Sequence, residues 1–166
     1  MPVFREVRRV QHSADEMFDL VADVERYHEF VPLCLRNAIV SRETRGEGEV
    51  LMTDMTVACG ICRESFRSRV TLDRANGFIL VESADGPLRR LRTRWTFHSQ
   101  SDGSCNVGFH LQYEFASRAL ALLMGPVFDV AFGRFVQAFE RRADIVYGRQ
   151  RARSLRSPPN VSVSFS

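Results

Sequence analysis

Two cysteines separated by two residues, Cys59 and Cys62, are the first candidates for chemistry in this sequence. The C-x-x-C spacing occurs in zinc sites and in thiol redox sites. A structural zinc site needs two further ligands, and here Cys34 and Cys105 would have to supply them from distant parts of the chain. A thioredoxin-like site would require the motif to open a helix, whereas this motif spans a predicted hairpin. We therefore predict neither a metal site nor a redox site.

Histidines and strand carboxylates are the next candidates, for acid–base catalysis. No histidine stands beside a cysteine or serine in a recognised nucleophile motif. Asp54, Glu64 and Glu114 are isolated on predicted strands, where such residues are usually solvated or paired with arginine, although burial of one would raise its pKa. The chain also contains no lysine, which excludes a Schiff base and a phosphate loop with its lysine. We predict no catalytic residue and no catalytic cofactor, and therefore a protein that is not an enzyme.

Arginine supplies all 23 basic side chains, against 20 acidic ones. Residues 1–148 carry 19 of these arginines and all 20 acids, so the excess positive charge belongs to residues 149–166. A near-neutral body argues against a dedicated duplex-DNA-binding domain, and we expect no DNA partner. The last residues are rich in arginine and then in serine and proline, a composition typical of disorder. We predict one domain, 1–148, followed by an arginine-rich disordered tail, 149–166.

The elements that must position these side chains follow from periodicity and turn signals. Val3–Val10 is a predicted strand, a capping box at Ser13–Glu16 starts a helix, and Arg26–Val31 is a second short helix. Six further strands are predicted at Ile39–Glu43, Glu49–Val57, Arg63–Leu72, Phe78–Glu82, Leu88–His98 and Cys105–Phe115. Ala119–Tyr147 is predicted as one long helix, with Gly125–Pro126 as the place for a kink.

Arginines alternate with apolar residues on two of the predicted strands. Arg63, Arg67 and Arg69 share one face of their strand, and so do the three arginines between residues 90 and 94. We interpret these faces as a solvated outer surface balanced by acidic residues. The alternative is a surface that contacts anionic lipid headgroups or ribosomal RNA.

Aromatic residues occupy the opposite faces of the strands and one stripe of the last helix. Phe128, Phe132, Phe135 and Phe139 recur at helical spacing, so this helix is expected to cover the apolar face of the sheet. One helix across a long curved sheet rarely fills the space between them. An apolar cavity with a few polar groups is the form that a small-molecule site takes. We therefore expect an α+β fold with a hydrophobic cavity.

Several segments together resemble the coenzyme Q-binding protein family of the START-like, or polyketide cyclase-like, superfamily. The resemblance covers roughly residues 1–148. The order and spacing of the matching segments together are more specific than any single segment. The segments are Val21–Cys34, Arg63–Phe66, Gly86–Leu88, Arg94–Phe97, Tyr113–Phe115 and Ala138–Ala143. The resemblance implies a helix-grip fold, in which a curved antiparallel sheet of about six to seven strands wraps around a long C-terminal helix. The arginine-rich tail departs from the family pattern.

The resemblance also implies a function. The expected activity is binding of ubiquinone (coenzyme Q) as a non-enzymatic chaperone that supports respiratory electron transport. The same family includes the ribosome association toxin, so inhibition of ribosomal subunit association, with the ribosome as partner, is the alternative. A third hypothesis is a cyclase or hydrolase on the same fold, which would need a polar constellation inside the cavity that the sequence does not identify. The expected ligand-binding residues lie on the sheet, on the last helix and at the cavity mouth. They are Tyr27, Phe30, Val31, Pro32, Phe66, Trp95, Phe97, Tyr113, Phe115, Met124, Phe128 and Phe132.

The expected location follows from the N-terminus and from hydropathy. Residues 1–6 do not read as a signal peptide, and we see no run of 18 apolar residues. Four cysteines without an export signal are most simply reduced thiols. We expect a bacterial protein of the cytoplasm that makes peripheral contact with the inner membrane through the amphipathic segment Tyr27–Cys34.

Overall fold

The computed structural model describes residues 2–148, apart from the side chain of Cys59. The predicted tail, 149–166, lies outside the described residues. The elements are, in chain order, β1 (Val3–Val10), α1 (Ala14–Ala22), the 3-10 helix η1 (Val24–Glu29), β2 (Cys34–Arg45), β3 (Gly48–Cys59), β4 (Cys62–Asp73), β5 (Phe78–Ser83), β6 (Leu88–Ser99), β7 (Cys105–Phe115), α2 (Arg118–Phe132) and α3 (Phe135–Val146).

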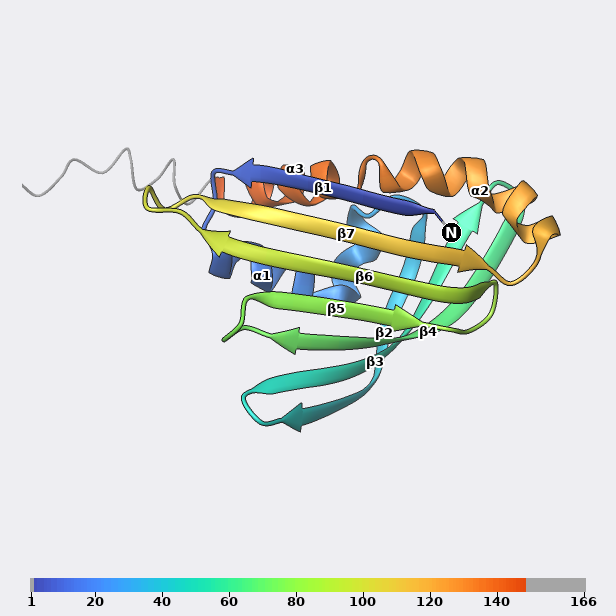
Figure 1. The fold of residues 1–166 in the computed structure, drawn as a ribbon, viewed down its shortest axis with the longest axis horizontal. Coiled ribbons are helices and arrows are strands. Elements are labelled where there is room, and N and C mark those ends of the chain that lie inside the picture. Colours follow the sequence, from blue (N-terminus) through green and yellow to red (C-terminus); the bar gives the residue numbers. More distant parts are fainter. Residues whose placement is uncertain (1, 149–166) are drawn as a thin grey trace, which may run out of the picture.

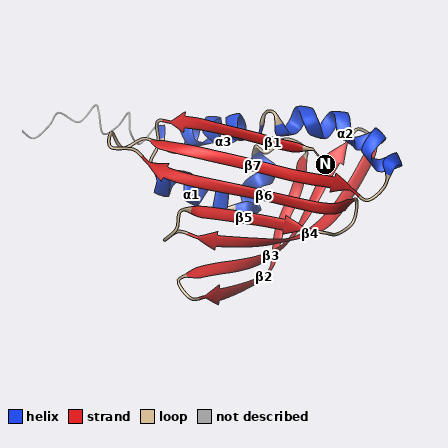
Figure 2. Cartoon of the chain, viewed as in Figure 1, coloured by secondary structure: helices blue, strands red, loops and turns tan. Residues whose placement is uncertain are grey.

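The seven strands form one antiparallel sheet in the order β1-β7-β6-β5-β4-β3-β2. The sheet is strongly curved, and the helices lie together on its concave side (Figures 1 and 2). Because only one face is covered, inward and outward residues alternate along each strand. This arrangement is the helix-grip architecture, and it confirms the predicted fold class.

Local sequence signals account for several element boundaries. The Ser13 hydroxyl accepts a hydrogen bond from the Glu16 amide at 3.1 Å, and the Glu16 carboxylate accepts one from the Ser13 amide at 3.0 Å. This capping box begins α1 where the sequence predicts it. Gly86 ends the turn before β6 with φ of +57°, and a side chain there would meet the Ser65 carbonyl oxygen at 2.7 Å. Only glycine fits both constraints.

The C-terminal helix differs from the prediction of one helix over Ala119–Tyr147. The structure divides it into α2 and α3, which are bent by 42°. Pro126 lies inside α2 and the break between the helices follows Phe132, at Gly133, so the 42° bend does not fall at Gly125–Pro126, where the sequence predicted a kink. The bend turns Phe132 and Phe135 toward each other, and their rings meet edge to face at 5.1 Å. Glycine has a low helix propensity, and this ring contact stabilises the corner.

Two other boundaries differ from the sequence-based expectation. The second helix is a 3-10 helix that spans Val24–Glu29 rather than Arg26–Val31. β2 begins at Cys34, five residues before the predicted start at Ile39. Irregularities in the β2–β3 pairing between Cys34 and Arg36 and between Ile39 and Ser41 break the alternation of the strand, which explains why its pattern was missed.

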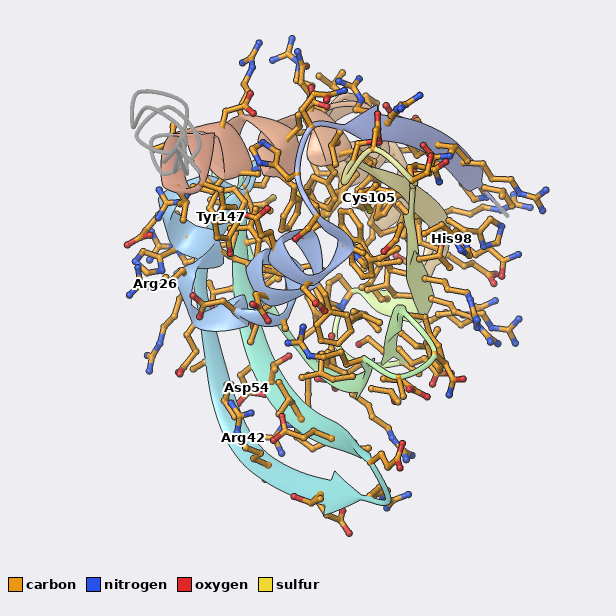
Figure 3. All side chains as sticks on the ribbon, turned by 90° about the vertical axis from the view of Figure 1, so that its left-hand side faces the viewer. Arg26, Arg42, Asp54, His98, Cys105 and Tyr147 are labelled. Carbon is orange, nitrogen blue, oxygen red and sulfur yellow. The ribbon has the colours of Figure 1, made fainter. Side chains whose placement is uncertain are left out.

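The outer face of the sheet carries the arginines of β4 and β6. Figure 3 shows polar side chains such as His98 pointing away from the body on this side. Arg67 is paired with Asp54 by bonds of 2.8 and 3.0 Å, as expected of a balanced surface. Among the described residues, however, Arg92 and Arg94 form no ion pair, and Arg94 instead covers the Phe78 ring at 4.5 Å. Among the described residues Arg63 and Arg69 of β4 form no ion pair either, while Arg89 of β6 pairs with Glu114 at 3.1 Å, so the predicted charge balance holds only in part on both strands.

Candidate functional site

An apolar cavity lies between the concave face of the sheet and the layer formed by η1, α2 and α3. Its volume is about 100 Å³. The strands β2, β3, β4, β6 and β7 supply inward side chains to it, while Phe128, Phe132 and Phe139 close it from the helices. Ligand pockets typically have volumes of roughly 300–1,000 Å³. The cavity as it stands therefore suits a ring-sized group, and a longer ligand requires the helices to move.

Aromatic rings form a large part of the cavity wall and pack against one another. Trp95 lies at the centre, with its ring centroid 4.6 Å from Phe109 and 4.8 Å from Phe139. On the α2 side, Phe132 contacts Tyr113 at 5.0 Å. Tilted and edge-to-face contacts of this kind stabilise a packed wall beyond the burial of area alone. The wall is therefore preformed and presents ring faces and edges to a ligand.

Eight of the twelve predicted site residues line this cavity. They are Tyr27, Val31, Pro32, Phe66, Trp95, Tyr113, Phe128 and Phe132. They come from η1, the η1–β2 connection, β4, β6, β7 and α2, which the fold brings around one space. Whether they bind a ligand stays a prediction.

Four predicted residues lie outside the cavity lining. Phe97 faces inward but packs beneath α1, where its ring meets Phe18 at 5.6 Å. The Phe30 ring packs against Phe139 at 5.0 Å without lining the cavity. The Phe115 ring likewise contacts Phe128 at 5.6 Å and does not line the cavity. Met124 is buried in the α2 interface. Alternation predicted that the strand residues face inward, but it could not predict which part of the interior they reach.

The sequence interpretation missed two groups of cavity residues. One group is apolar and includes Leu33 and Cys34, which follow the predicted mouth segment, and Phe109 of β7. The other group is polar and consists of Asn37, Thr53, Ser68 and Thr93. The inward position of Ser68 and Thr93 was readable from strand alternation, but that of Asn37 was hidden by the irregular pairing of β2.

The titratable groups of the cavity wall are held in their neutral forms. Burial raises the pKa of the Tyr27 hydroxyl, which donates a hydrogen bond to the Val21 carbonyl oxygen. Burial also raises the pKa of Tyr113, and the Asp129 carboxylate that accepts its hydrogen bond raises it further. The Cys34 thiol has a pKa raised to about 11 by burial. These groups therefore stay protonated near neutral pH, which suits binding of an uncharged ligand better than proton transfer.

The described residues within 2–148 contain neither a cluster of metal ligands nor a single helix that could span a membrane. In this part of the chain no three histidine, cysteine or acidic side chains are grouped closely enough to hold a metal ion. Cys62 is a half-buried free thiol, and the Cys59 side chain lies outside the described residues. No single described helix is long and apolar enough to cross a membrane, although α2 and α3 together reach that length and composition with the 42° bend between them.

Comparison with known proteins places this architecture in a family. The family described as polyketide cyclase / dehydrase and lipid transport matches residues 10–140. The chain belongs to this family. A relative from Escherichia coli K12, the ribosome association toxin RatA, is 34% identical over 89% of this chain and 90% of its own length. The mitochondrial coenzyme Q-binding protein coq10 of Schizosaccharomyces pombe is 28% identical over 86% of this chain and 87% of its own.

Among solved structures of the polyketide cyclase and lipid transport fold, the Zhui aromatase/cyclase from Streptomyces sp. R1128 superposes with a TM-score of 0.69. It is 16% identical, and the match covers 86% of this chain and 93% of that protein. At this identity the likeness concerns the fold alone. Members of one architecture can thus carry names of a toxin, a quinone-binding protein and a cyclase, so the function has to be argued from the cavity and the surface of this chain.

Proposed function

We propose that this protein binds ubiquinone or a similar isoprenoid lipid and carries it, without catalysing a reaction, in support of respiratory electron transport. The observation that carries the proposal is the apolar cavity around Trp95, whose tyrosine and cysteine groups are held neutral. The name of the coq10 relative supports the choice of ligand. Burial of an isoprenoid tail contributes roughly 0.8 kcal/mol per CH₂-sized group, so most of the affinity is expected from apolar contact.

The proposed carrier needs access to a membrane, where its ligand resides. The outward face of α2 supports peripheral contact, since Leu122 is 82% exposed and Leu123 and Val130 are each 57% exposed. Arg118, at the start of the same helix, is exposed and free of ion pairs among the described residues, and could meet an anionic headgroup. We place the protein in the bacterial cytoplasm, with α2 against the inner face of the inner membrane. This replaces the expected contact through Tyr27–Cys34, because Val31 and Cys34 of that segment are buried.

The proposal is tested by what the protein contains when it is purified. The protein is extracted with organic solvent, and the extract is analysed by mass spectrometry for quinones and other isoprenoid lipids. We expect ubiquinone in the extract and saturable binding when a short-chain ubiquinone is titrated. Absence of any lipid in the extract together with no binding in the titration would refute the carrier function.

A second candidate function is inhibition of ribosomal subunit association. The name of the RatA relative suggests it, and the unpaired Arg92 and Arg94 on the outer face of β6 favour contact with a polyanion. Arg94 also lies opposite His110 of β7, which in turn lies opposite Arg5 of β1, so basic side chains cross three neighbouring strands. Binding to ribosomal RNA should weaken steeply with salt. Sedimentation of lysates at low salt tests this function, and absence of the protein from subunit fractions removes it.

A further inference from the structure

Four polar side chains form part of the otherwise apolar cavity wall. They are Asn37 of β2, Thr53 of β3, Ser68 of β4 and Thr93 of β6, with 4%, 2%, 4% and 9% of their surfaces exposed. The rest of the lining is apolar apart from two tyrosines whose hydroxyls already donate to protein oxygens. A polar group on each of four strands is therefore an exception that needs an explanation.

The strand register brings these residues together. Thr53 lies directly opposite Ser68 across the β3–β4 pair. Asn37 lies opposite Met55, two residues from Thr53 on the same strand, and so occupies the diagonal position on the same face. Thr93 faces the cavity from the other side of β5, where it lies opposite Val81. Asn37, Thr53 and Ser68 thus form one continuous polar patch, and Thr93 adds a hydroxyl across the cavity.

This patch lacks hydrogen-bond partners within the protein. The side-chain oxygen of Asn37 is buried and has no partner among the described residues. The hydroxyls of Thr53, Ser68 and Thr93 form no hydrogen bond with any described residue either, whereas the buried Ser83 hydroxyl donates to the Arg67 carbonyl oxygen at 2.6 Å. Buried polar groups are nearly always paired in folded proteins, because an unpaired one destabilises the fold. The buried, unpaired Asn37 oxygen and three hydroxyls without a protein partner border the same cavity, which suggests that a bound molecule completes the pairing.

The chemistry of the patch restricts the partner. The three hydroxyls can donate or accept, and the Asn37 amide offers donors and one acceptor oxygen in either orientation of its plane. An oxidised benzoquinone ring carries only acceptors, so it would leave the Asn37 oxygen unpaired. A hydroquinone ring carries two hydroxyl donors and can still accept through the same oxygens. The patch is therefore better matched by a hydroxylated ring than by a quinone.

We propose that the Asn37, Thr53 and Ser68 patch binds the head ring of the ligand and favours the reduced quinol over the oxidised quinone. This inference rests on the proposed carrier function and adds the orientation of the ligand, with its head at β2–β4 and its tail toward α2. The ring faces of Trp95 and Phe109 complete the wall beside the patch.

The test uses the fluorescence of Trp95, which is the sole tryptophan of the chain and lines the cavity. Three probes are titrated anaerobically into the full-length protein: a decyl-tailed ubiquinone, its reduced quinol, and decylbenzene as a ligand without polar atoms. The variants are Asn37→Leu and Thr53→Val, which remove polar atoms with little change of shape. Thr71→Val, on the outward face of β4, is the matched control.

We expect the unaltered protein to bind the quinol roughly three- to tenfold more tightly than the quinone, the range of one neutral hydrogen bond. Asn37→Leu should remove this preference, and Thr53→Val should weaken binding of the polar probes by a similar factor. Decylbenzene binding should be unchanged in both, and Thr71→Val should behave like the unaltered protein. Because the variants remove unpaired buried groups, they should fold with undiminished thermal stability.

Two outcomes would overturn the inference and are distinguishable from failure of the carrier function. If Asn37→Leu keeps the quinol preference, or if the unaltered protein shows none, the patch does not select the head ring, although the cavity still binds quinones. If the unaltered protein binds none of the three probes, the carrier function fails and the inference fails with it.

Discussion

The two helices that cover the cavity, α2 and α3, are consecutive in the chain but are attached to the sheet in different ways. In α3, Phe139 contacts Tyr27 at 5.3 Å, Phe30 at 5.0 Å and Trp95 at 4.8 Å. Three polar contacts reinforce this packing: Glu140 pairs with Arg8 at 3.3 Å, Asp144 with His12 at 2.7 Å, and Arg142 with Glu29. α3 is therefore joined at once to β1, to the β1–α1 connection, to η1 and to β6.

α2 has fewer attachments. Among the described residues, one side-chain hydrogen bond joins it to another element, from the Tyr113 hydroxyl to the Asp129 carboxylate. Its inner face contributes Met124, Phe128 and Phe132 to the core, while its outer face leaves apolar side chains in solvent. A helix that is apolar on both sides is normally covered on both. The difference indicates that α3 is the fixed support of the cavity and α2 is the wall that can move to admit a tail.

The largest effect should come from removing the aromatic anchor of α3. Phe139→Ala deletes a ring that contacts three rings from other elements, and we expect it to lower the free energy of unfolding by about 4 kcal/mol. Phe128→Ala in α2 removes one ring contact to another element, that with Phe115, and should have less than half this effect. Urea denaturation measures both. Equal losses would contradict the distinction between a fixed helix and a movable one.

The exposed face of α2 predicts the second effect, on membrane binding. Replacing Leu122 and Leu123 by serine removes two apolar groups from the proposed contact, each worth about 1.5–3 kcal/mol when fully buried. Binding to vesicles of phosphatidylcholine and phosphatidylglycerol should fall by at least about tenfold. Flotation of vesicles with bound protein is the measurement.

Val7→Ser is the matched control for membrane binding, since Val7 is 76% exposed on the outward face of β1, whereas α2 lies on the concave side of the sheet (Figure 1). Stability should change by no more than about 0.5 kcal/mol in all these surface variants. If Val7→Ser reduces vesicle binding as much as the α2 variant does, then α2 is not the membrane contact.

The hydrogen bond between Tyr113 and Asp129 should control how often α2 opens. Tyr113→Phe removes the donor and leaves the ring, and a hydrogen bond to a charged group contributes about 1.5–3 kcal/mol at most, less at an exposed carboxylate such as Asp129. We expect amide hydrogen exchange in α2 to accelerate by roughly five- to thirtyfold. Peptides from α3 should exchange at the original rate, and acceleration in both helices would mean that they move as one unit.

The sequence predicted the regular parts of this fold well. β1 and β7 have the predicted bounds, because strict alternation of buried and exposed residues leaves no other register. α1 begins where its capping box lies. The prediction of one undivided last helix was wrong. The Phe128–Phe139 stripe continues at helical spacing through Gly133, so the sequence pattern shows no break there. The bend depends on a ring contact that only the tertiary structure forms.

The candidate site was predictable in composition and less so in position. Trp95 and Phe97 both face inward on β6, yet only Trp95 reaches the cavity, because α1 covers the other end of the strand. The polar patch could not be found from spacing, since Asn37 and Ser68 are far apart in the sequence and meet only through the register of β3. Cys34 was predicted as a reduced thiol at the end of the amphipathic segment Tyr27–Cys34, and the structure places it in the cavity wall.

The smallest effect concerns this thiol and reports on the movement of α2. Because burial raises the pKa of Cys34 to about 11, the reactive thiolate is a small fraction that grows about tenfold per pH unit below that value. Alkylation of Cys34 by iodoacetamide, followed by mass spectrometry, should therefore still rise steeply between pH 8 and 9, where an ordinary thiol with a pKa of about 8.5 levels off. A plateau in this range would mean that Cys34 is open to solvent.

The same measurement compares the two helices at a fixed pH. Tyr113→Phe should raise the alkylation rate of Cys34 about threefold, since the reagent enters when α2 opens, and it should leave the pH dependence unchanged. Arg141→Ala, on the solvent side of α3, is the control and should have no effect. If the α3 control accelerates alkylation as much as the α2 variant does, the cavity opens through α3, and the assignment of fixed and movable walls must be reversed.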